Sequence, residues 1–196
     1  KTLLANAVIV TMDNENPVVK GDIGIDGDTI SFVGKENTFT PDYTKDVKGN
    51  IIMPGLINAH THSPMTLLRC YADDLNLHDW LFTKIIPAED KFTEEDIYWG
   101  SQLGCWEMIS SGTTAYADMY FLSKATAKAA KESGMRANIC RALQCFNESE
   151  SYKDDPLMRQ ALDLYTEFNN AANGRIVVDL SAHAVYTNTP GYLRFI

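Results

Sequence analysis

The fold is decided by residues 51–62, which read Ile51-Ile52-Met53-Pro54-Gly55-Leu56-Ile57-Asn58-Ala59-His60-Thr61-His62. The first seven residues form a nearly continuous apolar run, which is typical of a strand buried on both faces of a parallel sheet. His60 and His62 follow where such a strand would end. Side chains at positions i and i+2 of a strand point to the same side, so both imidazoles can reach one metal ion. The stretch therefore predicts a strand with two metal ligands at its carboxyl end.

Downstream of these histidines, predicted helices and strands alternate. Thr93 is a typical N-cap, and its helix has apolar residues at helical spacing: Trp99, Leu103, Trp106 and Ile109. The expected order then runs strand Thr113–Tyr120, helix Ser123–Ser133, strand Met135–Leu143, helix Asp155–Ala172, strand Arg175–Val185 and a helix near Thr189. A glycine closes each long helix just before the next strand: Gly112, Gly134 and Gly174. This alternation predicts a parallel sheet with helical crossovers.

The number of strands suggests part of a larger architecture. Four parallel strands are expected, and a (β/α)8 barrel of the TIM type needs about 250 residues. We therefore predict that residues 54–196 form the first half of such a barrel.

The segment before it, residues 1–53, is predicted to be a separate unit of short strands. Leu3–Met12, Asp22–Asp26 and Thr29–Val33 have strand-like patterns, and Gly27 marks a hairpin turn. A sheet this small has too little apolar area for its own core, so we expect it to pack on something else.

The composition excludes some classes of protein. The chain has 26 acidic and 17 basic residues, a formal net charge of −9, whereas nucleic-acid binding needs a basic face. No apolar run approaches the ~18 residues of a membrane span, and Lys1–Asn6 does not begin a signal peptide. We therefore expect a cytoplasmic protein that binds neither nucleic acid nor membrane.

The four cysteines, Cys70, Cys105, Cys140 and Cys145, lie in apolar stretches. Without a secretion signal they are expected to be reduced core residues. Metal binding by Cys140 and Cys145 is the less favoured alternative, because their spacing recurs nowhere else.

A catalytic zinc ion usually keeps three protein ligands, so the histidine pair alone would not complete a site. His183 ends the last predicted strand and is, by geometry alone, a candidate third ligand. His78 lies in a polar stretch and is expected to be a loop residue.

Residues 54–62 resemble the first-strand signature of the amidohydrolase superfamily. Later segments are similar to the methylthioadenosine / S-adenosylhomocysteine deaminases and their chlorohydrolase-related relatives: Met65–Arg69, Tyr71–Leu75, Asp79–Leu81, Ile86–Glu89, Ser111–Thr114, Gly134–Ala137 and His183–Thr187. The resemblance covers nearly the whole chain. It implies a metal-dependent (β/α)8 barrel with a small β-sandwich built from both termini.

The resemblance also implies roles for particular residues. His60 and His62 would bind the metal. Glu89 would contact the ribose hydroxyls of the substrate, and Arg141 would help to hold the substrate. His183 matches a substrate-contacting histidine of the family, and we prefer this role to that of a third ligand.

No catalytic residue is expected within this chain. The family's third metal histidine, metal-binding aspartate and proton-transferring residues lie on later strands. The chain is therefore expected to be a fragment of a protein roughly twice its length, since it carries only half of a barrel. A truncated half-barrel without catalysis is an alternative.

The implied activity is hydrolytic deamination of adenine nucleoside thioethers, methylthioadenosine or S-adenosylhomocysteine, with adenosine as a further substrate. Zinc is the favoured divalent ion for a histidine-rich hydrolytic site, with iron or manganese as alternatives. A related subgroup of the family holds two metal ions with a modified lysine at the end of the fourth strand. Strand Arg175–Val185 has no lysine, so the resemblance implies one metal ion. A homo-oligomer is expected. A deaminase or chlorohydrolase of another heterocycle, such as guanine or a triazine, stays open.

Overall fold

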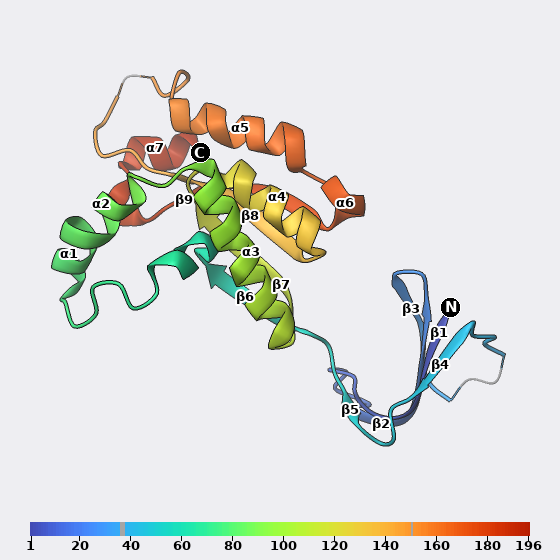
Figure 1. Cartoon of the computed structure of the whole chain (residues 1–196). Coiled ribbons are helices and arrows are strands. Elements are labelled where there is room, and N and C mark those ends of the chain that lie inside the picture. Colours follow the sequence, from blue (N-terminus) through green and yellow to red (C-terminus); the bar gives the residue numbers. More distant parts are fainter. Residues whose placement is uncertain (36–37, 150) are drawn as a thin grey trace. The chain divides into compact units, whose positions relative to one another are not determined.

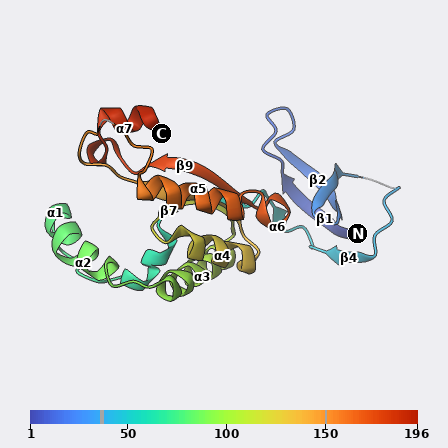
Figure 2. The same cartoon turned by 90° about the horizontal axis from the view of Figure 1, so that it is seen from above.

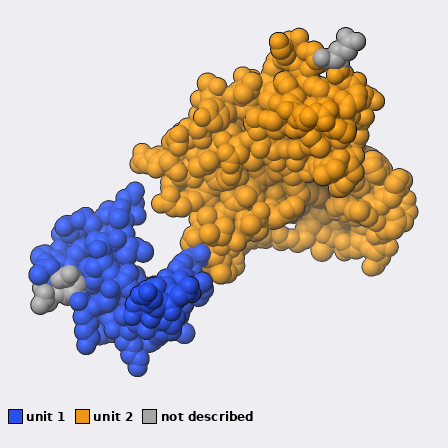
Figure 3. Space-filling view, turned by 180° about the vertical axis from the view of Figure 1, so that it is seen from behind, with its two compact units in different colours: residues 1–55 blue, residues 56–196 orange. Residues whose placement is uncertain are grey.

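The structure is a computed structural model that describes residues 1–35, 38–149 and 151–196. The chain divides into two compact units, residues 1–55 and 56–196 (Figure 3). The sequence predicts a domain boundary after Met53, and in the structure the first unit ends at Gly55. Among the described residues, no helix combines the length and apolar character that crossing a membrane requires.

The first unit contains one mixed sheet (Figure 1). Its strands are β1 (Thr2–Val10), β2 (Val18–Asp26), β3 (Thr29–Gly34), β4 (Tyr43–Asp46) and β5 (Ile51–Ile52). The first three strands are antiparallel in the order β3-β2-β1, and β4 and β5 run parallel to β1. The buried apolar core consists of Ala7, Ile9 and Ile23. That this sheet packs on something further stays a prediction.

The second unit contains a four-stranded parallel sheet in the order β6-β7-β8-β9. Its strands are β6 (Leu56–Thr61), β7 (Thr113–Tyr120), β8 (Arg136–Leu143) and β9 (Ile176–Ala182). The crossover helices α3 (Glu94–Ser110), α4 (Ser123–Ser133) and α5 (Pro156–Phe168) pack on one face of this sheet (Figures 1 and 2). The predicted alternation of parallel strands and helices is confirmed.

Shorter helices fill the connections. Between β6 and α3 lie η1 (Ser63–Leu68), α1 (Leu77–Asp79), η2 (Trp80–Ile85) and α2 (Ile86–Glu89), and near β9 lie α6 (Ala171–Gly174), η3 (Val185–Thr187) and α7 (Pro190–Phe195). Helices α3 and α4 begin and end as the sequence predicts. The helix expected over Asp155–Ala172 ends at Phe168, and Gly174 is the last residue of the separate short helix α6. Thr93 and Asp96 form a capping box at the start of α3. The three closing glycines, Gly112, Gly134 and Gly174, all have positive φ.

The main core lies between the helices and the sheet. Its buried members are Cys105, Met108, Tyr116, Ala127, Ala130, Met135, Ala137, Ile139, Leu164, Phe168, Ile176 and Val178. Since side chains alternate along a strand, Ala137 and Ile139 face the helices, and Asn138 and Cys140 face the opposite side of β8. This opposite side carries the candidate site.

The expectation of one buried strand over Ile51–Ile57 is wrong. Ile51 and Ile52 belong to β5 of the first unit, and β6 begins only at Leu56. Pro54 lies between the two strands and has no N–H to donate to a ladder. Among the described strands β6 pairs only with β7, so it is an edge strand and Ile57 is 74% exposed.

One expected apolar face also differs. On α3 the apolar stripe Trp99, Leu103, Trp106 and Ile109 is exposed, and small residues such as Gly100, Ser101, Gly104 and Cys105 face the core. All four cysteines are free, but Cys70 is exposed and not a core residue.

Small residues let α3 approach η1, which directly follows His62. A Cβ atom on Gly100 would lie 2.6 Å from the Pro64 carbonyl oxygen, whereas one on Gly104 would lie 3.2 Å from the Ser63 Cβ atom. The contact at Gly100 is shorter and involves a backbone atom, so it can be relieved less easily than the contact at Gly104, which involves a side-chain atom.

We expect Gly100→Ala to lower the free energy of unfolding by about 1–3 kcal/mol, because the clash outweighs the better helix propensity of alanine. Gly104→Ala, on the same helix, is the matched control and should lose less. Urea denaturation of both variants measures the difference. Equal stability of the two variants would contradict the assigned close approach.

Candidate metal centre

The two histidines lie together at the carboxyl end of β6, His60 within the strand and His62 directly after it. The ring centroids of His60 and His62 are 5.1 Å apart, with their planes at 76°. They line a cavity of about 220 Å³. The other lining residues come from β6, β7, β8 and β9: Ala59, Thr61, Ala117, Asp118, Met119, Asn138, Cys140 and Ser181.

One hydrogen bond orients the His62 ring. Its Nδ1 atom lies 2.6 Å from the Met119 carbonyl oxygen. A carbonyl oxygen only accepts, so Nδ1 carries the hydrogen and Nε2 keeps its lone pair. A metal-binding histidine typically donates its second ring N–H in this way. His62 is thus prepared to bind a cation through Nε2.

A buried carboxylate lies beside this pair. Asp118 is 3% exposed, and its Oδ2 atom accepts a hydrogen bond of 2.6 Å from the Ser63 N–H. The Thr61 hydroxyl is 2.8 Å from both Asp118 Oδ2 and the Ala117 carbonyl oxygen. Burial raises the pKa of Asp118, and the hydrogen bonds oppose that shift. Sequence reasoning assigns this residue no role, although an acid within a buried strand is a usable signal.

Glu89 reaches the same region from α2. The Tyr120 hydroxyl donates a short hydrogen bond to Glu89 Oε1, and the Tyr120 ring centroid is 6.0 Å from that of His62. Burial raises the pKa of Glu89, and the hydrogen bond from Tyr120 opposes the shift. Sequence reasoning missed Tyr120, because nothing local distinguishes it from a core tyrosine.

His183 follows β9 and is held by Thr187. The Thr187 hydroxyl donates to the Ala184 carbonyl oxygen, so it accepts from His183 Nδ1 at 3.0 Å. This leaves the Nε2 lone pair of His183 free. Burial lowers the pKa of His183, and repulsion from the nearby His62, when that ring is protonated, adds to the shift.

Arg141 lies apart from this group. Its Nε donates to Gln160 Oε1 of α5 at 2.8 Å, and its guanidinium also contacts the Ala142 carbonyl oxygen. Burial lowers the pKa of Arg141. The structure thus brings Glu89 and His183 toward His62, and it holds Arg141 against α5.

The described residues supply part of a metal-ligand set. Residues 1–35, 38–149 and 151–196 contain no cluster of three or more His, Cys, Asp or Glu side chains that could hold a metal ion. The histidine pair offers two nitrogen donors, and a catalytic zinc ion typically takes three protein ligands. His60 and His62 therefore fit a metal ion but do not complete its coordination.

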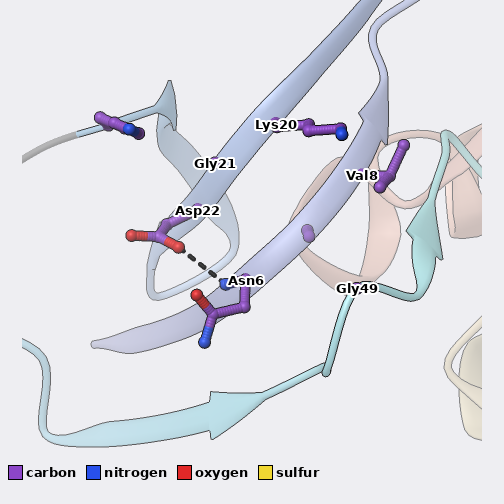
Figure 4. Close-up of a pocket in the computed structure, with 8 residues that line it drawn as sticks. Asn6, Val8, Lys20, Gly21, Asp22 and Gly49 are labelled. Atoms are coloured by element: carbon purple, nitrogen blue, oxygen red, sulfur yellow. Dashed lines mark hydrogen bonds between the residues drawn. The ribbon is translucent and has the colours of Figure 1, made fainter.

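A larger hollow lies in the first unit. It measures about 710 Å³, and its lining residues include Asn6, Lys20, Asp22 and Lys35. Figure 4 shows the hydrogen bond of 2.8 Å from the Asn6 N–H to Asp22 Oδ1 beside it. The described lining residues include no histidine or cysteine, so the smaller cavity is the better candidate for metal chemistry.

Comparisons with known proteins point the same way. Residues 51–196 match the amidohydrolase family. The chain is 44% identical over 189 residues to the 5-methylthioadenosine/S-adenosylhomocysteine deaminase of Acetivibrio thermocellus, an alignment that covers 94% of this chain and 43% of the relative. It is 42% identical over 193 residues to the 5'-deoxyadenosine deaminase of Methanosarcina barkeri, an alignment that covers 97% of this chain and 44% of that relative. The chain spans less than half the length of these curated relatives.

Solved structures share the fold. An adenosine deaminase from Xanthomonas campestris with bound zinc is 30% identical, with a TM-score of 0.81 over 95% of this chain and 44% of that chain. The atrazine chlorohydrolase of Arthrobacter aurescens TC1, complexed with zinc, is 23% identical, with a TM-score of 0.83 over 97% of this chain and 48% of that chain. At 23% identity the second match shows the fold alone. The resemblance predicted from the sequence motifs is confirmed.

The burial of Glu89 predicts a pH dependence of stability. Its pKa is raised above the usual value of about 4.5, so the folded state binds this proton more tightly than the unfolded state. Its stabilising contribution is therefore fully present below about pH 4.5 and is lost as the pH rises through the folded pKa. Glu89→Gln should flatten this part of the profile, measured by urea unfolding between pH 4 and 8.

Glu132→Gln is the matched control, because Glu132 accepts a hydrogen bond from the Tyr98 hydroxyl at the exposed surface. This variant should keep the wild-type profile. A Glu89→Gln profile identical to wild type would show that burial of Glu89 does not influence stability.

Proposed function

The chain belongs to the amidohydrolase family, and from that premise we propose that it is part of a metal-dependent hydrolytic deaminase of adenine nucleosides. The substrates would be methylthioadenosine or S-adenosylhomocysteine, with adenosine as a further candidate. The names of the relatives that are 42–44% identical support this proposal. The observation that carries it is the histidine pair with Glu89 held beside it by Tyr120.

In this proposal His60 and His62 hold one divalent metal ion, with zinc preferred over iron or manganese. The ion, when bound, lowers the pKa of a water molecule toward neutrality and so supplies the nucleophile. The hydrogen bond from His62 to the Met119 carbonyl oxygen keeps the ring in the tautomer that can bind. The remaining ligands and the proton-transferring groups would come from residues outside this chain.

Glu89 would bind the ribose hydroxyls of the substrate. Tyr120 occupies one carboxylate oxygen, Oε1, and leaves Oε2 to accept hydrogen bonds from a diol. His183 would contact the substrate through its free Nε2 atom. For Arg141 to contact substrate, its hydrogen bond with Gln160 would have to be exchanged for one with the ligand. These contacts orient the substrate and would affect binding more than the chemical step.

We also propose the larger architecture. The four parallel strands would be the first half of a (β/α)8 barrel, and the sheet of residues 1–55 would be one part of a β-sandwich. The fold shared with two zinc-containing solved structures supports the barrel. Homo-oligomer formation and a cytoplasmic location stay predictions.

The first test is an ultraviolet assay for conversion of the adenine ring to hypoxanthine, using the complete protein that carries this chain. We expect turnover of methylthioadenosine or S-adenosylhomocysteine, and loss of turnover after chelation or in His60→Ala. Zinc-loaded protein that ignores both nucleosides but converts guanine or a triazine would favour the alternative heterocycle. A protein of half the length of its relatives without any turnover would favour a non-catalytic half-barrel.

The second test addresses the role of Glu89. Glu89→Ala should raise KM for the nucleoside by about 10–100-fold, as expected for a lost charge-assisted hydrogen bond, with a smaller change in kcat. Turnover of free adenine, which lacks ribose, should be unaffected. Tyr120→Phe should raise the nucleoside KM less, and Glu132→Gln serves as the unaffected control. An equal loss with adenine and with nucleoside would contradict the assignment to ribose.

A further inference from the structure

The ends of β6 and β7 are joined residue by residue around the histidines. Thr61 donates to the Ala117 carbonyl oxygen, His62 to the Met119 carbonyl oxygen and Ser63 to the Asp118 carboxylate, and all three partners belong to β7. The regular ladder does not supply these bonds, because the pairing of β6 with β7 shifts register between Asn58 and Thr61. Irregular pairing of this kind redirects side chains. Near His60, hydrogen bonds to side chains and carbonyl oxygens of β7 therefore take the place of regular hydrogen bonds between the two strands.

Asp118 is central to this junction. Its Oδ2 atom accepts from the Ser63 N–H at 2.6 Å and lies 2.8 Å from the Thr61 hydroxyl. Thr61 and Ser63 are the two neighbours of His62, so one carboxylate holds the residues on both sides of that histidine. Loss of the carboxylate would free the Ser63 N–H and leave the Thr61 hydroxyl bonded only to the Ala117 carbonyl oxygen.

The second oxygen of Asp118 has a different environment. Oδ1 is buried and has no hydrogen-bond partner among the described residues. Leaving a buried acceptor unpaired costs about 1–3 kcal/mol, and more for a charged group. Asp118 also lines the cavity that contains His60 and His62. A cation in this cavity would compensate for the unpaired charge.

We propose that Asp118 is a positioning residue of the metal centre, which fixes the backbone around His62 and adds an uncompensated negative charge that favours a divalent cation. The inference rests on the proposed metal site. It assigns Asp118 no place among the metal ligands. Partners that orient metal ligands typically change metal affinity by 10–100-fold when they are mutated.

The test is the affinity of the complete, metal-free protein for Co²⁺, measured by competition with a chelator and by the visible absorption of bound Co²⁺. Asp118→Asn keeps the size of the side chain and an acceptor oxygen but removes the charge. We expect its Kd to rise by about 10–100-fold, with altered visible bands. Thr61→Val should give a smaller rise, because Ser63 still contacts Asp118, and Thr61→Ser should restore wild-type binding.

A structural control separates positioning from general destabilisation. Leu164→Ala removes a side chain that is 1% exposed in the main core, away from the cavity lining. It should lower the melting temperature and leave the Kd for Co²⁺ unchanged. An unchanged Kd in Asp118→Asn, or an equal loss in Leu164→Ala, would overturn the inference. If wild-type protein itself binds no Co²⁺, the proposed metal site is wrong, which is a separate outcome.

Discussion

The junction between the ends of β6 and β7 is the constraint on which the candidate site depends. β6 has a strand partner on one side only among the described strands, and its pairing shifts register just before Thr61. A strand end held by so few ladder bonds would leave two histidines poorly ordered. The carbonyl of Met119 and the carboxylate of Asp118 supply the missing order. The sheet brings the residues of the site together, and these hydrogen bonds fix the orientation of His62 and its neighbours.

The packing of α3 against η1 also constrains the backbone next to this junction. α3 lies so close to η1 that small residues are required at its inner face, and Gly100 faces the Pro64 carbonyl oxygen. Pro64 is two residues beyond His62. Helix packing and the orientation of His62 are thus coupled through one short stretch of backbone. The exposed apolar stripe of α3 has no part in this coupling.

Sequence reasoning predicted what local patterns encode. The start of α3 followed from Thr93 and the ends of α3 and α4 from Gly112 and Gly134, and the histidine pair followed from its spacing at a strand end. The inner face of α3 was missed, because close packing there selects small residues instead of large apolar ones. Tyr120 and Asp118 were missed as site residues for another reason. Their partners, Glu89 and Ser63, lie 31 and 55 positions away, and no local pattern records such contacts.

These sequence separations have a consequence for the order of assembly. The bonds that orient Thr61, His62 and Ser63 close loops of 55–57 residues that include the whole of α3. Closing a loop of this length costs chain entropy before the contacts can form. An emerging polypeptide that ends soon after His62 therefore has both imidazoles but no means of fixing them. If this position is the proposed metal site, cation capture there would be a late event that follows the docking of β7 and does not nucleate the fold.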